Sequence, residues 1–279
     1  MLKYRIISSV LIIVGLLAAA IWMPASGLIA IVATVAMLAA AEFAGLTFAA
    51  GLPQCRCVGI LGSTCLILVT GWGLLTKESG WASELEAFVL LVVIVCTCLI
   101  VMFRDVERPL LAVSTTMATI LYAPFLLNFV TKLLFGLGGD GRYLVLYMIL
   151  VVKSTDIGAF FIGSAIGKHK FFPRISPAKT WEGSLGGVTV GTVASTVAGL
   201  ITGGDFGVIQ ISLVHSVLLG ILLSVTGVFG DLIESMFKRA AQIKDSGTWI
   251  RGMGGILDVI DSLILAAPVL YLYCRFIKT

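Results

Sequence analysis

The polar side chains between Asp231 and Asp261 have types and spacings that suit phosphate chemistry. Asp231, Glu234, Ser235 and Lys238 fall at positions i, i+3, i+4 and i+7, which places them on one face of a helix. Asp258 and Asp261 share one face of the next predicted helix. Carboxylates that face each other repel unless a cation lies between them. Their hard oxygens suit Mg²⁺, which usually binds one or two protein carboxylates together with substrate phosphates.

The same segment holds the positive groups that such a site needs. Lys238, Arg239 and Lys244 follow the first carboxylate closely. A short, glycine-rich linker ending in Gly254 and Gly255 leads into the second helix, so we expect the two helices to be antiparallel neighbours. A glycine-flanked helix N-terminus also offers N–H groups to an anion. Metal, cations and amide donors together indicate a phosphate or pyrophosphate site.

A second candidate piece lies in the basic connection after the sixth apolar segment. Two prolines stiffen this predicted loop, which contains Arg174, Ser176 and Lys179. The two basic side chains could reach the phosphates of a nucleotide. Upstream, Asp156 lies in an apolar helix with Lys153, and these two residues could instead form an intramembrane ion pair.

Long apolar runs supply the elements that must position these groups. Of the 279 residues, 59% are hydrophobic and 12% are charged, whereas a soluble domain carries about twice that share of charge. A helix needs roughly 20 apolar residues to cross the hydrocarbon core, and these runs lack the alternation of barrel strands. We predict an all-α, polytopic membrane protein with about nine transmembrane helices, near residues 6–23, 27–50, 57–75, 86–103, 109–130, 143–166, 184–203, 209–236 and 255–276. Pro124 could kink the fifth.

Charge is distributed unevenly along the chain. Basic residues gather after the even-numbered segments, which places those loops and the C-terminus in the cytoplasm and the N-terminus outside. Lys3 and Arg5 argue against this orientation.

Residues 1–140 are expected to form a scaffold of transmembrane helices, with Glu42 as a structural or interface acid. In residues 141–279 charges enter or flank the helices, at a cost of roughly 2.5–3.5 kcal/mol for one at mid-membrane. We therefore expect the second region to be catalytic.

Composition excludes some classes of partner and site. The net charge of +4 is small and is accounted for by loop orientation, so no nucleic-acid partner is expected. The six cysteines form no disulfide framework, and the Cys55-x-Cys57 pair lacks further metal ligands nearby.

Structural explanations remain open for the candidate residues. Asp231 and Asp258 could form ion pairs with Lys238 or Lys244 at helix ends, and Asp261 could be a core acid that orients Asp258. The basic pair after the first carboxylate could be an ordinary cytoplasmic anchor.

Two motifs resemble the signature of the phosphatidate cytidylyltransferase family, also called CDP-diacylglycerol synthases. One reads Ser235-x-x-Lys238-Arg239-x4-Lys244-Asp245-x-Gly247, followed by Gly254-Gly255-x-x-Asp258-x-x-Asp261. The other reads Ser176-Pro177-x-Lys179-Thr180-Trp181-Glu182-Gly183, preceded by Asp156-x-Gly158. The resemblance covers the C-terminal half in detail and the N-terminal half only in hydropathy.

The resemblance implies a reaction in which the phosphate of phosphatidic acid attacks the α-phosphorus of CTP, giving CDP-diacylglycerol and pyrophosphate. It implies Mg²⁺ held by Asp231 and Asp258, and it allows a second cation, K⁺. Catalytic roles fall to Asp231, Asp258, Lys238, Arg239, Lys244 and Asp261. Substrate-binding roles fall to Ser235, Lys179, Arg174, Ser176, Asp245, Gly254, Gly255 and Asp156.

The resemblance also implies a place in the cell. We expect a multi-pass protein of a bacterial inner membrane, with CTP arriving at a cytoplasmic site and the lipid entering from the bilayer. A homodimer is allowed. Three positions depart from the family pattern, because Met253, Val259 and Arg251 stand where a His, an Arg and a small residue or Pro are usual.

Other functions remain open. The intramembrane acids would also suit a cation- or proton-coupled transporter, although transport acids usually lie near the midplane. A CTP-dependent lipid kinase, or a divergent paralogue of reduced activity, would share much of the same site.

Overall fold

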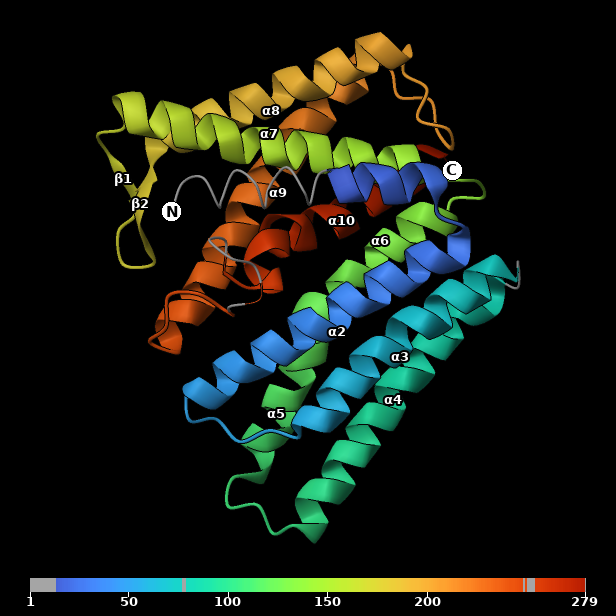
Figure 1. Cartoon of the computed structure of the whole chain (residues 1–279), viewed down its shortest axis with the longest axis vertical. Helices are drawn as coiled ribbons and strands as arrows, with labels where there is room; N and C mark the ends of the chain where they lie inside the picture. Colours follow the sequence, from blue (N-terminus) through green and yellow to red (C-terminus); the bar gives the residue numbers. More distant parts are fainter. Residues whose placement is uncertain (1–13, 77–78, 248, 250–253, 279) are drawn as a thin grey trace. The chain divides into compact units, whose positions relative to one another are not determined.

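The computed structural model describes residues 14–76, 79–247, 249 and 254–278. Within them, eight helices are long and apolar enough to cross a membrane. They correspond to the second to ninth predicted segments, so the all-α, polytopic class is confirmed. Residues 14–22 of the first predicted segment, 6–23, are also helical, and residues 6–13 lie outside the described residues. Figure 1 shows the helices, which have the following bounds: α2 Ala25–Ala49, α3 Arg56–Leu75, α4 Ser79–Phe103, α5 Pro109–Ile120, α6 Leu126–Phe135, α7 Arg142–Ile166, α8 Trp181–Thr202, α9 Leu213–Ala240 and α10 Ile256–Lys278.

One membrane-length helix is interrupted. Between α5 and α6 lies η1 (Leu121–Phe125), a π-helical turn that contains Pro124. Proline has no N–H, and its ring would clash with the carbonyl four residues earlier in a regular α-helix. The irregularity expected at Pro124 therefore takes the form of a local widening of the helix.

The chain forms two compact units, and the first comprises residues 1–132 and 238–259. In this unit α2 packs on α3, and α3 packs on α4 and α5. Helix α2 buries Ala36, Ala39, Ala40 and Ala44 completely. Small side chains allow membrane helices to approach closely, where packing rather than exclusion from water drives association.

The second unit comprises residues 133–237 and 260–279. Helices α7 and α8 lie side by side along their length (Figure 1). A Cβ at Gly187 would lie 2.7 Å from the carbonyl oxygen of Thr155, and one at Gly191 would clash with the Thr155 hydroxyl. Glycine at these positions therefore brings α8 onto α7. The Thr155 hydroxyl also lies 2.7 Å from that of Ser224, which joins α7 to α9.

A short antiparallel hairpin connects α7 to α8. Strand β1 (Lys170–Phe172) pairs with β2 (Ser176–Thr180), where we predicted an irregular loop. The prolines at 173 and 177 conceal the strand pattern, but a two-stranded hairpin has free edges that tolerate a missing N–H. Thr180 then begins α8, because its hydroxyl accepts the Gly183 N–H at 3.1 Å.

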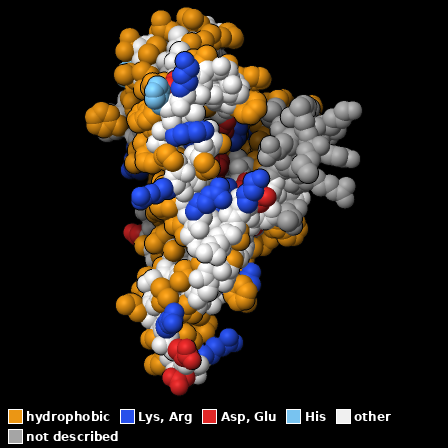
Figure 2. Space-filling model, turned by 90° about the vertical axis from the view of Figure 1, so that its left-hand side faces the viewer, with side chains coloured by type: hydrophobic (Ala, Val, Ile, Leu, Met, Phe, Trp, Pro, Cys, Tyr) orange, Lys and Arg blue, Asp and Glu red, His pale blue; other side chains and the backbone are white. Residues whose placement is uncertain are grey.

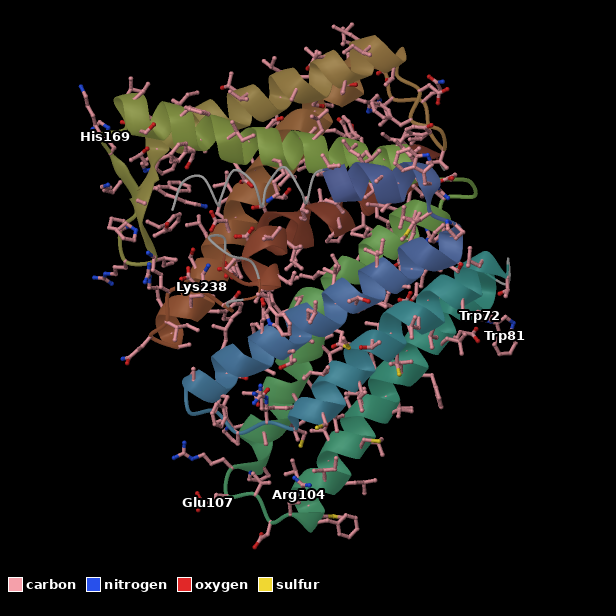
Figure 3. All side chains as sticks on the ribbon, viewed as in Figure 1. Trp72, Trp81, Arg104, Glu107, His169 and Lys238 are labelled. Atoms are coloured by element: carbon pink, nitrogen blue, oxygen red, sulfur yellow. The ribbon has the colours of Figure 1, made fainter. Side chains whose placement is uncertain are left out.

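The surface carries many large hydrophobic side chains, as expected of helices in contact with lipid. Phe103, Ile201 and Phe276 are each about four-fifths exposed. Figure 2 shows hydrophobic side chains over much of the visible face, with Lys and Arg in a few separate places. Trp72 and Trp81, labelled in Figure 3, lie near the end of α3 and the start of α4. Tryptophan favours the membrane–water interface.

Candidate functional site

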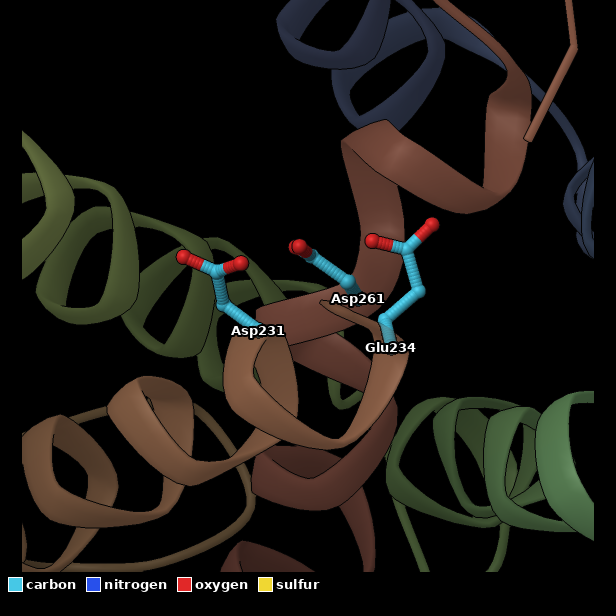
Figure 4. Close-up of side chains that lie close together, drawn as sticks. All are labelled: Asp231, Glu234 and Asp261. Carbon is cyan, nitrogen blue, oxygen red and sulfur yellow. The ribbon is translucent and has the colours of Figure 1, made fainter. Parts of the chain in front are cut away.

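The second unit contains a compact group of three carboxylates. Asp231 and Glu234 lie on α9 and Asp261 lies on α10, and each contributes an oxygen within 4.8 Å of the others (Figure 4). Glu234 is fully buried and Asp261 is nearly so. The two helices meet closely at Gly230, where a Cβ would lie 2.5 Å from the carbonyl oxygen of Asp261. The glycine therefore sets the approach that brings the carboxylates together.

Two lysines from other elements face this group. Lys179 on β2 places its Nζ 2.8 Å from Asp231 Oδ2. Lys153 on α7 places its Nζ 3.1 Å from Asp156 Oδ2. The ion pair between Lys153 and Asp156, considered from the sequence, is thus present.

Hydroxyl groups complete the polar surroundings. Asp261 Oδ1 accepts the Ser262 N–H at 2.5 Å and lies 3.0 Å from the Ser262 hydroxyl. That hydroxyl is 3.5 Å from both carboxylate oxygens of Asp156. The Ser235 hydroxyl is 3.4 Å from Asp231 Oδ1. Helices α7, α9 and α10 and strand β2 therefore all contribute to one polar site in the second unit.

The charges of this site fit a divalent cation. Asp231, Glu234 and Asp261 each place an oxygen within 4.8 Å of the other two, and Glu234 and Asp261 are buried. Buried carboxylates at such distances repel each other strongly without a cation. The three closest oxygens are hard ligands of the kind that Mg²⁺ binds. Lys153, Asp156 and Lys179 lie beside these three carboxylates in the same polar site.

The first unit holds a different arrangement around Asp258. Its Oδ1 lies 2.6 Å from Lys238 Nζ. Its Oδ2 accepts the N–H groups of Ser246 at 2.9 Å and of Gly255 at 2.7 Å. Gly254 has a φ of +97°, and a Cβ there would lie 2.5 Å from Asp258 Oδ2. Asp258 therefore fastens the preceding linker to the first turn of α10.

Glu42 fastens the same helix end from a distant part of the chain. Its carboxylate is buried and accepts the N–H groups of Ile256 at 2.8 Å and Leu257 at 2.7 Å. It also accepts the Ser246 hydroxyl at 3.1 Å. These N–H groups have no partner within the helix. Glu42 is thus structural, as expected, and its negative charge also suits a helix N-terminus.

The predicted site residues fall into three sets. The second unit brings together Asp156, Lys179, Asp231, Ser235 and Asp261. The first unit brings together Lys238, Gly254, Gly255 and Asp258. The remaining predicted residues lie at or near the surface, and these are Arg174, Ser176, Arg239, Lys244 and Asp245.

The predicted metal pair, Asp231 and Asp258, is divided between the units. A metal role for Asp258 stays a prediction. Among the three departures from the family pattern, Arg251 and Met253 lie outside the described residues. Val259 is a half-buried residue of α10.

Sequence reasoning left three residues out of the second unit's site. The spacing of three residues placed Glu234 on the same helix face as Asp231, but Glu234 was not included among the predicted site residues. Lys153 was noted only as a partner of Asp156. Ser262 carried no signal beyond its position next to Asp261.

The fold and this site define a multi-pass membrane protein with a carboxylate group able to hold a cation. The chain belongs to the cytidylyltransferase family, whose model matches residues 3–277. It is 41% identical over 131 residues to a phosphatidate cytidylyltransferase from Bacillus subtilis, covering 47% of each chain. It is 38% identical over 137 residues to one from Haemophilus influenzae, covering 49% of this chain and 47% of that protein. The chain thus spans about half the length of the curated relatives it matches.

Proposed function

We propose that this protein is a phosphatidate cytidylyltransferase, which joins CTP and phosphatidic acid into CDP-diacylglycerol and releases pyrophosphate. The observation that carries the proposal is the close group of Asp231, Glu234 and Asp261, the last two buried, flanked by Lys179. Family membership and the names of the relatives support the same reaction.

In the proposed reaction, an oxygen of the lipid phosphate attacks the α-phosphorus of CTP. The bond from that phosphorus to the bridging oxygen breaks, and pyrophosphate leaves with the electron pair. Asp231, Glu234 and Asp261 would hold Mg²⁺, which neutralises charge on the phosphates. Lys179 would contact a phosphate oxygen while it remains close to Asp231.

We propose that the residues around Asp258 contribute to substrate binding. Lys238 and the N–H groups of the linker before α10 are donors that could turn toward a phosphate. Arg174, Ser176, Arg239, Lys244 and Asp245 are proposed to contact CTP from the surface.

We further propose that the protein lies in a bacterial inner membrane with this site facing the cytoplasm. The basic connections after α4 and α7 support that orientation. Fusion of a reporter to the α7–α8 hairpin, read for cytoplasmic or periplasmic activity, tests it. The rate measured with K⁺ omitted tests whether K⁺ is a second cation. A mass measurement in detergent tests whether the protein forms a homodimer.

The experiment that tests the reaction uses CTP labelled at one phosphate at a time. The purified protein is incubated with phosphatidic acid and Mg²⁺, and the lipid fraction is counted. Cytidylyl transfer predicts that an α-phosphate label enters the lipid and a γ-phosphate label leaves as pyrophosphate. Label from the γ-phosphate in the lipid would instead identify a CTP-dependent lipid kinase.

Variants connect the reaction to the site. Asp231→Asn, Glu234→Gln and Asp261→Asn each remove one charge with little change of shape, and each is expected to abolish label transfer. Asp140→Asn is the matched control, because Asp140 is an exposed carboxylate paired with Arg142 in the same unit. Full activity in Asp261→Asn would overturn the site assignment, and ion flux without CTP would favour a transporter.

A further inference from the structure

A cavity of about 870 Å³ lies in the first unit, away from every residue given a role above. Its lining comes from the α2–α3 connection, the end of α4 and the start of α5. Arg104 and Glu107, on the α4–α5 connection, are labelled at this end of the unit in Figure 3. The cavity therefore opens where membrane-length helices end, at the level expected of lipid head groups.

The lining of the cavity is positively charged. Its lining includes three arginines, Arg56, Arg104 and Arg108, and a single acidic residue, Glu107. None of the three guanidinium groups forms an ion pair with a carboxylate among the residues that the structure describes. Arginine binds phosphate through parallel N–H donors. The lining thus favours an anion with several acceptor oxygens.

Hydrogen bonds hold part of the cavity lining in place, two of them formed by hydroxyl groups of α5. Thr115 donates to the carbonyl oxygen of Pro53, and the Cys55 N–H donates to Thr116 Oγ1 at 2.9 Å. The Gln54 amide donates to the carbonyl oxygen of Ala44. A binding surface fixed before the ligand arrives loses little conformational entropy on binding.

The walls of the cavity are apolar. Leu52, Val58, Ile100 and Val106 line it between the arginines. A free inorganic anion would gain nothing from these side chains, whereas the glycerol and upper acyl carbons of a lipid would bury against them. The combination of basic head-group contacts and apolar walls at a helix end selects an amphiphile.

We propose that this cavity binds the head group of an anionic phospholipid, with its phosphate held by Arg56, Arg104 and Arg108. The lipid bound here is separate from the substrate of the proposed reaction, since no lining residue belongs to either carboxylate site. The inference therefore stands whether or not the proposed cytidylyl transfer is confirmed.

Cys57 provides a direct reporter, because it lines the cavity and is exposed. The full-length protein with Cys57 as its single cysteine is placed in nanodiscs of phosphatidylcholine, with or without phosphatidylglycerol. The rate of Cys57 modification by a neutral, water-soluble maleimide is then measured. We expect phosphatidylglycerol to slow the modification several-fold.

Substitution of the arginines tests the recognition. Each basic contact near a membrane surface corresponds to about a fivefold change in affinity, so the triple variant Arg56→Gln, Arg104→Gln, Arg108→Gln should lose the protection. Lysine at the same three positions keeps the charge and should retain part of it. Lys170→Gln, an exposed position on β1, serves as the control and should leave the protection unchanged.

Three outcomes would overturn the proposal. These are equal modification rates in the two lipid compositions, equal protection in the triple glutamine variant, and full protection by inorganic phosphate in phosphatidylcholine nanodiscs. The last outcome would assign the site to a soluble anion. Size-exclusion profiles of the variants in nanodiscs show whether each remains folded.

Discussion

Lys179 Nζ lies 2.8 Å from Asp231 Oδ2, and this ion pair joins the hairpin between α7 and α8 to the carboxylate group on α9. The same ammonium group donates to the carbonyl oxygen of Val228 at 3.1 Å. The lysine is therefore held by two acceptors on one helix. It is a positive group in direct contact with one of the carboxylates proposed to hold the cation.

Replacement of Lys179 should remove activity and leave the fold intact. Lys179→Met removes the ammonium group, and loss of one donor aimed at transition-state charge typically costs about 100-fold or more in kcat. Lys179→Arg keeps a positive charge and should recover part of the rate. Label transfer from α-labelled CTP measures both.

The matched control for this substitution is Lys170→Met, on the partner strand of the same hairpin. Lys170 is exposed, and its loss should leave the rate within about twofold of the original. Equal losses in the two variants would mean that the hairpin, rather than the Lys179 charge, is responsible.

The carboxylate group should bind Mg²⁺ in the absence of substrate. A ligand at 100 times its dissociation constant stabilises the folded state by about 2.7 kcal/mol, so Mg²⁺ should raise Tm by several degrees. Asp261→Asn should abolish that shift. It should also stabilise the metal-free protein, because it relieves repulsion from Asp231 and Glu234. Thermal unfolding with Mg²⁺ or a chelator measures both effects.

Asp140→Asn is the control for the binding experiment, since Asp140 pairs with Arg142 outside the group. It should keep the full Mg²⁺ shift. A shift that survives Asp231→Asn, Glu234→Gln and Asp261→Asn together would place the cation elsewhere.

The close approach of α9 and α10 should be necessary for cation binding. Gly230→Ala places a methyl group against the carbonyl oxygen of Asp261, which is backbone and cannot rotate away. The helices must separate, and the carboxylates move apart. We expect a loss of Mg²⁺-induced stabilisation that is larger than the loss of fold stability.

Gly45→Ala on α2 is the control for that change, because a Cβ at Gly45 meets no atom within 4 Å. Alanine is a better helix former than glycine by about 1 kcal/mol, so this variant should be neutral or slightly stabilised. Similar Mg²⁺ shifts in the two alanine variants would contradict the role of Gly230.

The sequence allowed the helices to be predicted because each is a local property of about 20 apolar residues. The spacing of Asp231 and Ser235 likewise predicted a shared face of α9. The contact of Glu42 with Ile256 could not be predicted, because it joins residues 214 positions apart. The position of Lys179 depends on a hairpin whose strand pattern is hidden by prolines. Tertiary packing, rather than local pattern, decides such partners.

Glu42 should contribute strongly to the stability of the first unit. Glu42→Ala leaves the buried N–H groups of Ile256 and Leu257 without their acceptor, at a cost of about 1–3 kcal/mol for each group. Glu42→Gln keeps one oxygen and should lose less stability. Thermal unfolding in detergent measures the difference. Glu84→Ala, at an exposed position on α4, is the control. Equal Tm values for the alanine variants at 42 and 84 would contradict the capping role.

The thiol of Cys55 should report the charge of the arginine cavity through its pH dependence. Burial raises the pKa of the Cys55 thiol above its ordinary value, while the nearby Arg104 guanidinium and the hydrogen bond to Thr116 lower it. Arg104→Gln removes one of the lowering influences, so the pKa should rise further. Because the thiolate is the reactive form, alkylation at neutral pH should become slower and its pH profile should move to higher pH.

Iodoacetamide kinetics across pH, on a variant with Cys55 as its single cysteine, measure this shift. Lys170→Gln is the control and should leave the profile unchanged. If the profile stays in place or moves to lower pH when Arg104 is replaced, the Arg104 charge does not lower the pKa of the Cys55 thiol.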